Sequence, residues 1–177
     1  MRNRAKILSL IFLATASTAL LAGCTTDGGQ KPIAKTGGST VTTPSNSTAG
    51  IPSVSGAAGS APTIAAPQGA APTSLQTQDV IVGTGATAVS TSTLTVHYTL
   101  MAWSTGKVVE SSWSGGQPAT FALAQVIPGW QQGIPGMKEG GRRVLVIPPA
   151  LGYGAAGSGP IGPNETLIFV VDLIKVA

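Results

Sequence analysis

The clearest pattern in this chain is a strict alternation of apolar and polar residues. At positions 93–100 the apolar residues hold every even position, the period of a strand buried on one face. Two further runs, 143–147 and 167–174, are rich in β-branched residues and are bounded by Pro, Gly or Asn. Shorter strand candidates lie at 79–82, 107–112 and 120–123. Together these segments predict an antiparallel sheet.

A single segment has the spacing of a helix. Apolar side chains recur at helical intervals in the order Val126, Trp130, Ile134 and Met137. Pro128 suits the first turn of a helix and Pro135 should end it. We therefore predict an α+β domain over residues 75–177, with one short α-helix packed on a twisted antiparallel β-sheet. About 100 residues are enough for such a domain to fold alone.

The N-terminus has the features of an export signal. Arg2, Arg4 and Lys6 precede an uncharged run at 7–21, which is shorter than the roughly 20 residues that a membrane-spanning helix needs. The tetrad Leu-Ala-Gly-Cys at 21–24 resembles the bacterial lipobox. We read residues 1–23 as a lipoprotein signal peptide and Cys24 as the lipidation site. Thr25 follows that Cys in place of Asp, which by resemblance to Gram-negative sorting favours the outer membrane.

Residues 24–74 are predicted to be the lipidated Cys followed by a disordered tether. Within 25–74, 39 of the 50 residues are Gly, Ala, Ser, Thr or Pro, and none is aromatic. Such a segment buries too little apolar surface to offset the entropy of the chain. A glycosylated or wall-threading stalk is the alternative, because Ser and Thr are abundant.

Charge and rare residues exclude several function classes. Lys and Arg number 10 against six Asp and Glu, but residues 75–177 hold five of each sign, so a nucleic-acid partner has no support. One Cys and one His cannot form a disulfide or a structural zinc site, and we expect no metal or cofactor.

His97 alternates to the polar face of its strand, where we expect it to be solvated. The G-x-G-x-x-G match at 152–157 precedes a Pro- and Gly-rich stretch, which indicates a flap rather than a dinucleotide site.

Aromatic residues gather in the C-terminal part of the chain. Trp130 lies at the start of the predicted helix, and Tyr98, Tyr153, Ile161 and Phe169 lie on separate segments. These side chains could converge on an apolar concavity, the usual form of a small-ligand or side-chain site. They could equally be the core of a small domain, and composition alone does not separate the two readings.

Five sequence blocks in order resemble an FKBP-type peptidyl-prolyl cis/trans isomerase over residues 75–177. The blocks are Val96-His97-Tyr98-Thr99, 106–112, Val126-Ile127-Pro128-Gly129-Trp130, Gly152-Tyr153-Gly154-Ala155 and 163–169. The resemblance implies an FKBP-like twisted antiparallel sheet half-wrapped around one short helix. It also implies an enzyme that accelerates rotation about X-Pro bonds, a reaction that breaks no covalent bond.

The resemblance further implies a site. The catalytic residues that it carries over are Tyr98, Glu110, Trp130, Tyr153 and Phe169. The substrate-binding residues are Val109, Val126, Ile127 and Ile161. In the family the Trp ring is the floor under the substrate proline, while the Ile backbone N–H and the flap Tyr hydroxyl are offered to substrate carbonyls. The implied partners are proline-containing polypeptides and macrolide inhibitors, and we expect a monomer.

This chain departs from the family pattern at the rim of that site. Val109 and Ala119 stand where an aromatic residue is common, Glu110 replaces Asp, and Leu100 replaces a frequent Gly. We expect a weaker catalyst with poorer macrolide affinity. Our first hypothesis is an exported isomerase in the cell envelope, lipid-anchored on the outer membrane facing the periplasm or at the cell surface, which assists folding of envelope or secreted proteins. The alternatives are a non-catalytic proline-peptide-binding or chaperone module and a structural lipoprotein with a vestigial domain.

Overall fold

The computed structural model describes residues 50–177. The predicted signal peptide, Cys24 and the first part of the predicted tether lie outside the described residues. The strands are β1 (Val54–Ser55), β2 (Thr63–Ile64), β3 (Gln76–Ile81), β4 (Thr93–Ala102), β5 (Lys107–Ser111), β6 (Ala119–Ala122), β7 (Arg142–Ile147) and β8 (Leu167–Val176). The helices are α1 (Pro128–Gly133) and the 3₁₀ turns η1 (Ser112–Gly115), η2 (Leu123–Gln125) and η3 (Pro149–Leu151). No helix in the described part of the chain is long and apolar enough to span a membrane.

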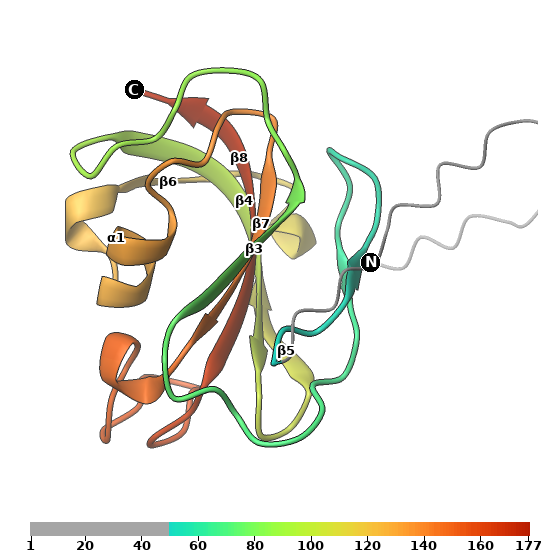
Figure 1. Ribbon diagram of the computed structural model, residues 1–177, viewed down its shortest axis with the longest axis vertical. Coiled ribbons are helices and arrows are strands. Elements are labelled where there is room, and N and C mark those ends of the chain that lie inside the picture. The colour runs from blue at the N-terminus through green and yellow to red at the C-terminus, as the bar shows by residue number, and fades with distance from the viewer. Residues whose placement is uncertain (1–49) are drawn as a thin grey trace, which may run out of the picture. The chain divides into compact units, whose positions relative to one another are not determined.

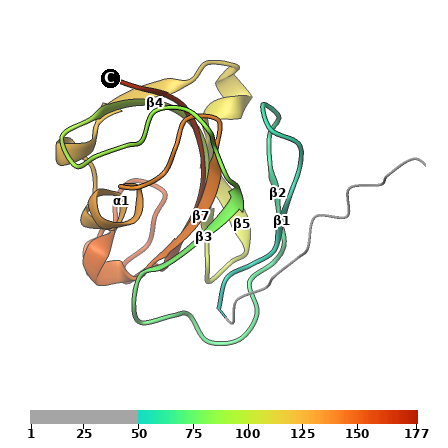
Figure 2. The same cartoon turned by 45° about the horizontal axis from the view of Figure 1, so that its top comes forward.

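The main sheet is antiparallel and has the order β3-β7-β8-β4-β5. Strand β4 is its long central element: β8 pairs along one edge, while β6 and β5 pair with successive halves of the other. The sheet curves around α1, which lies on its concave side (Figures 1 and 2). Period-2 alternation in β4 and β8 sends one set of apolar side chains toward the helix and a second set toward the opposite face.

Helix α1 packs closely on β7 because two of its residues have no side chain. A Cβ added at Gly129 would lie 2.4 Å from Cγ2 of Ile147, and one at Gly133 would lie 2.5 Å from Cδ2 of Leu145. This contact places Trp130 inside the larger apolar core, where its side chain is 4% exposed. The glycines therefore set the depth at which the indole lies.

The sequence predicted this domain well. Each of the predicted strands is present, and α1 begins at Pro128 as expected and ends at Gly133, just before Pro135. The α+β prediction of a twisted antiparallel sheet around one short helix is confirmed.

The prediction of a disordered tether is wrong for residues 50–74. Here β1 and β2 form an antiparallel hairpin that lies on the side of the sheet opposite α1 (Figure 2). Ile51 and Ile64 are buried in a second apolar cluster, whose other buried members come from the main sheet: Met101, Val144, Val146, Ile168 and Val170. Burying one such side chain stabilises the folded state by about 1.5–3 kcal/mol. A few apolar residues therefore order a segment whose overall composition is typical of disorder.

A buried arginine fastens the same hairpin to the sheet. Arg142 of β7 is fully buried, and its guanidinium donates hydrogen bonds to the backbone oxygens of Gly56 (3.0 Å) and Ser60 (2.6 Å). Its Nε also donates a hydrogen bond to Oδ1 of Asp172 on β8 at 2.8 Å, and its Nη2 lies 2.7 Å from the same oxygen in an ion pair. The hairpin thus supplies carbonyl acceptors to a cation that the sheet alone leaves partly unsatisfied.

Candidate functional site

The candidate site is centred on the indole of Trp130. Ile127 caps the helix, and its carbonyl accepts the Trp130 N–H at 3.0 Å, which fixes the first turn and the direction of the ring. The indole Nε1 is buried and has no hydrogen-bond partner in the described residues. An indole held this way offers a flat apolar surface.

Three other rings stand nearly perpendicular or tilted around that indole. Phe169 of β8 lies 5.3 Å away at 86°, Phe121 of β6 at 5.8 Å and 81°, and Tyr98 of β4 at 6.1 Å and 82° (ring centroids and interplanar angles). Edge-to-face contacts of this kind are the favoured arrangement of aromatic pairs. The four rings form a floor with upright walls, a geometry suited to a flat saturated ring such as that of proline.

Phe121 was missed by the sequence reasoning. It lies two residues beyond Ala119, so the two side chains share one face of β6, and Leu94 of β4 is its cross-strand partner. Phe121 therefore brings a ring to the cluster in the strand where Ala119 carries none. The signal available in the sequence was that residues 119 and 121, two apart in a strand, face the same side.

The remaining apolar residues of the predicted site belong to the same cluster. Val109, Val126 and Ile127 are half-buried against it, and Ile161 is 8% exposed within it. The side-chain amide of Gln131 donates to the carbonyl of Val126 at 2.7 Å and so holds the segment that leads into α1. Within the described residues, the Ile127 backbone N–H makes no hydrogen bond, which leaves a donor beside the indole.

Tyr98 and Glu110 form the polar side of the site. The Tyr98 hydroxyl donates to Oε1 of Glu110 at 2.5 Å, across the β4–β5 pair. Burial raises the pKa of Tyr98 well above its usual value, and the hydrogen bond and charge of Glu110 raise it further. The phenol is therefore protonated at neutral pH, and its proton is directed to the carboxylate.

Tyr153 supplies a second phenol from the loop after η3. It is 36% exposed, and burial, followed by the charge of Glu110, raises its pKa. Because its pKa is raised, the Tyr153 hydroxyl is protonated at neutral pH. Among the described residues that hydroxyl has no hydrogen-bond partner, so it is free to donate. The charge of Glu110 raises the pKa of both phenols.

His97 lies on the polar face of β4, as the sequence predicted, but it is not fully solvated there. The prediction of a solvated strand residue is wrong: the ring is half-buried and stacks on Trp113, with centroids 3.8 Å apart and planes at 16°. Its Nδ1 is hydrogen-bonded to Oγ of Ser112 at 2.9 Å. Because His97 alternates with Tyr98 on β4, it faces away from the aromatic site.

Comparison with known proteins identifies the family. Residues 85–174 match the family of FKBP-type peptidyl-prolyl cis-trans isomerases, which is half of the chain. An FK506-binding protein of Streptomyces anulatus is 50% identical over 106 residues, covering 58% of this chain and 86% of the relative. An FK506-binding protein of Neisseria meningitidis is 49% identical over 107 residues, covering 58% of this chain and 96% of the relative.

Solved structures agree. The crystal structure of FkpA from Escherichia coli is similar with a TM-score of 0.55 at 42% identity, covering 58% of this chain and 47% of FkpA, so the match spans about half of that protein. The crystal structure of AtFKBP13 is similar with a TM-score of 0.54 at 38% identity, covering 58% of this chain and 93% of that one. The chain belongs to the FKBP-type peptidyl-prolyl cis-trans isomerase family and is an isomerase of that type.

Proposed function

We propose that this protein is a lipid-anchored isomerase of the cell envelope, which accelerates rotation about X-Pro bonds in envelope or secreted polypeptides and so assists their folding. The four-ring site around Trp130 is the observation that carries the catalytic part of the proposal. The sequence at 1–24 carries the part concerning location.

The substrate proline would lie on the Trp130 indole, with Phe121, Phe169 and Tyr98 as walls. Apolar contact of this kind binds the pyrrolidine ring and excludes water from the adjoining amide. Val126 and Ile127 would form the remaining wall, with Val109 and Ile161 at the margin. Only the proline needs a shaped pocket, so such a site tolerates many residues on either side of the bond.

The chemistry asks for a change of environment rather than for a bond-making group. An X-Pro amide resists rotation by about 18–20 kcal/mol because resonance keeps it planar, and uncatalysed exchange takes tens to hundreds of seconds. The twisted amide has less charge separation than the planar one, so a dry apolar site favours the transition state over the ground state. Lowering the barrier by about 5–7 kcal/mol would accelerate exchange roughly 10⁴–10⁵-fold.

Two donors are positioned to hold the substrate while the amide twists. The Ile127 N–H would donate to one substrate carbonyl and the Tyr153 hydroxyl to another. Glu110 accepts the hydrogen bond of the Tyr98 hydroxyl and so holds that phenol at the polar side of the site. Fixed donors of this type stabilise a transition-state geometry without reorganising during the reaction.

The N-terminal sequence would place this domain at a membrane. Acylation of Cys24 would anchor the mature chain, each buried CH₂ contributing about 0.8 kcal/mol, and residues 25–49 would link that anchor to the β1–β2 hairpin. Thr25 favours the outer membrane, facing the periplasm or the cell surface. The isomerase domain, for which we predicted residues 75–177, would then act on clients near that membrane.

Relatives named FK506-binding proteins motivate one further expectation. A macrolide of that kind would compete with the proline for the same four-ring site. Because Val109 and Ala119 lack rings, we expect binding to be weaker than in family members with aromatic residues there.

The test is an exchange assay on Ala-X-Pro-Phe peptides, read by NMR or by a coupled protease, with Trp130→Leu as the site variant. We expect the unaltered protein to accelerate exchange and Trp130→Leu to lose most of that acceleration while circular dichroism shows a folded domain. Saturable peptide binding with no acceleration would instead establish the non-catalytic binding module. If the protein shows no peptide binding and no acceleration, the proposed activity is overturned.

A further inference from the structure

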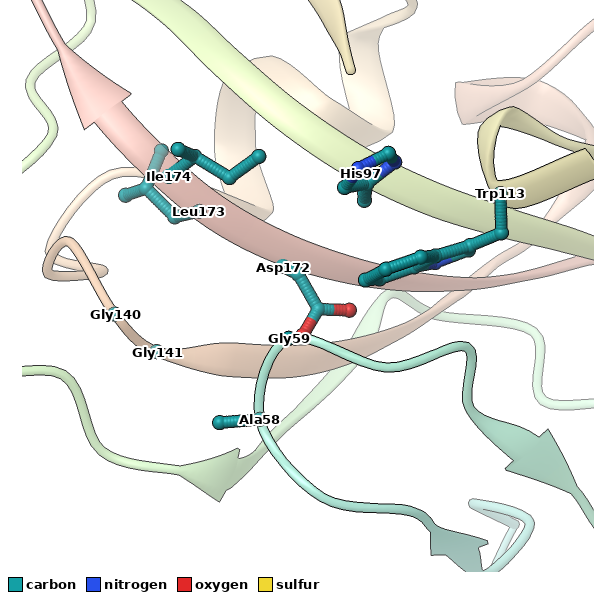
Figure 3. Close-up of a pocket in the computed structure, with 9 residues that line it drawn as sticks. All are labelled: Ala58, Gly59, His97, Trp113, Gly140, Gly141, Asp172, Leu173 and Ile174. Atoms are coloured by element: carbon teal, nitrogen blue, oxygen red, sulfur yellow. The ribbon is translucent and has the colours of Figure 1, made fainter. Parts of the chain in front are cut away.

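A second cavity lies on the face of the sheet opposite the aromatic site. It has a volume of about 320 Å³ and lies between the turn of the β1–β2 hairpin and strands β4 and β8 (Figure 3). Ala58 and Gly59 line it from the hairpin, His97 and Asp172 from the sheet, and Trp113 from η1. Small-ligand sites have volumes of roughly 300–1,000 Å³, so the cavity is of the right size for one small molecule.

Asp172 is the most informative group in this cavity. The residue is 8% exposed, and both its hydrogen bond and its ion-pair contact with Arg142 are made through Oδ1. Its Oδ2 is buried and has no hydrogen-bond partner among the described residues. In Figure 3 the carboxylate projects from β8 toward the Ala58–Gly59 turn, with the Trp113 indole beside it. A buried carboxylate oxygen without a donor is unusual in a folded protein and points to a group that supplies one.

The charges around Asp172 define what that group can be. Arg142 is fully buried beside the carboxylate, and its remaining hydrogen bonds go to the Gly56 and Ser60 carbonyls. A cationic ligand would meet this buried guanidinium, and an anionic ligand would meet the Asp172 carboxylate. The pair is neutral as a whole, so the site suits an uncharged ligand with O–H or N–H donors.

Trp113 adds a second requirement. Its indole is stacked on His97, whose imidazole is hydrogen-bonded to Ser112 through Nδ1, and Trp113 also lines the cavity. Its Nε1 is buried and lacks an acceptor in the described residues. The ligand should therefore present a flat apolar surface together with a hydrogen-bond acceptor.

We propose that this cavity binds an uncharged pyranose sugar. Hydroxyl groups of the ring would donate to Oδ2 of Asp172 and accept from Nε1 of Trp113, while the C–H face of the ring packs on the indole. Gly140 and Gly141 line the cavity without side chains, which leaves room for the ring. Because Oδ2 of Asp172 and Nε1 of Trp113 are both buried, the proposal requires the Ala58–Gly59 turn to move outward as the sugar enters.

The test uses the full-length chain labelled with 5-fluorotryptophan, whose three Trp residues report separately in fluorine NMR. The probes are glucose and N-acetylglucosamine, titrated to tens of millimolar. We expect a saturable shift of the Trp113 resonance with at least one sugar, while the Trp130 resonance stays unchanged. No saturable shift with either sugar, or a shift of Trp130 alone, would overturn the proposal.

A matched pair of variants locates the binding. Ala58→Leu places a larger side chain at the cavity, whereas Ala57→Leu makes the same change at the neighbouring exposed position, which does not line it. We expect Ala58→Leu to weaken sugar binding at least tenfold and Ala57→Leu to leave it unchanged. The Trp103 and Trp130 resonances show that both variants are folded. Equal affinity in the two variants would mean that the sugar binds elsewhere.

Discussion

Replacing Arg142 by Met should destabilise the domain far more than the loss of a surface charge would. The guanidinium is fully buried and donates three hydrogen bonds, one to Asp172 and two to hairpin carbonyls, and its Nη2 also lies 2.7 Å from Oδ1 of Asp172 in an ion pair. Methionine fills similar space but leaves the Asp172 carboxylate buried without its counter-ion. Breaking a buried pair in this way costs about 3–5 kcal/mol, a large part of the 5–15 kcal/mol by which a domain is typically stable.

The assay is reversible thermal and urea unfolding followed by circular dichroism. For a domain of this size, about 3–5 kcal/mol corresponds to a fall in Tm of about 10–20 °C. Arg143→Met is the matched control, because the neighbouring Arg143 pairs with Asp79 at 2.6 Å but with side-chain exposures of 13% and 39%. An exposed pair contributes about 0–1 kcal/mol, and Arg143 also donates to the Gly133 and Pro135 carbonyls, so we expect the control to lose about 1–2 kcal/mol.

The double variant Arg142→Met/Asp172→Leu separates burial of charge from packing. With both charges removed, most of the stability lost in Arg142→Met should return, since apolar residues often replace a buried ion pair at no cost. A loss below about 1 kcal/mol in Arg142→Met would refute the reasoning, because it would mean that neither Asp172 nor the hairpin depends on the guanidinium.

Three further predictions concern the site, the anchor and pH. Tyr153→Phe should lower kcat/KM about 2–10-fold in the exchange assay with unchanged Tm, because it removes one exposed donor; equal kcat/KM would remove Tyr153 from the mechanism. Cys24→Ser should abolish metabolic palmitate labelling, and persistent labelling would refute the lipobox interpretation. Burial raises the pKa of Asp172 above its usual 3.8, although Arg142 opposes the shift. The folded state therefore binds a proton at Asp172 more readily than the unfolded chain does. As the pH rises from 3.8 through the raised pKa, the free energy of unfolding of the native protein should fall relative to that of Arg142→Met/Asp172→Leu, which lacks this carboxyl. Urea unfolding of both proteins across that pH interval measures the difference in unfolding free energy. A difference that rises with pH would contradict the raised pKa of Asp172.

The catalytic domain was predictable because its signals are local. Alternation over residues 93–100 requires a strand with one buried face, and Pro128 and Pro135 bracket the helix. The order of the sequence blocks then indicated the family, and the structure brings Tyr98, Trp130 and Phe169 into ring contact. Their part in catalysis stays a prediction until the exchange assay is done.

The hairpin was not predictable from the same kind of signal. Its composition favours disorder, and the contacts that order it join residues far apart in sequence: Gly56 lies 86 residues before Arg142, and Ser60 lies 82 residues before it. Near Ile51 and Ile64 in the chain only Val54 packs against the same cluster, and the other buried members come from the outer face of the sheet. Composition reports average behaviour, whereas a few well-placed apolar contacts decide whether a segment docks.

By itself the sequence determined the strands of the main sheet, the position of α1 and the family, because periodicity, proline punctuation and motif order can be read along the chain. The residues of the isomerase site stay a prediction. Only the tertiary structure decided that Phe121 completes the ring cluster, that residues 50–74 dock as a hairpin, and that Asp172, Trp113 and His97 line a second cavity. These features depend on which faces of separate strands meet, and contacts between residues far apart in the sequence decide that.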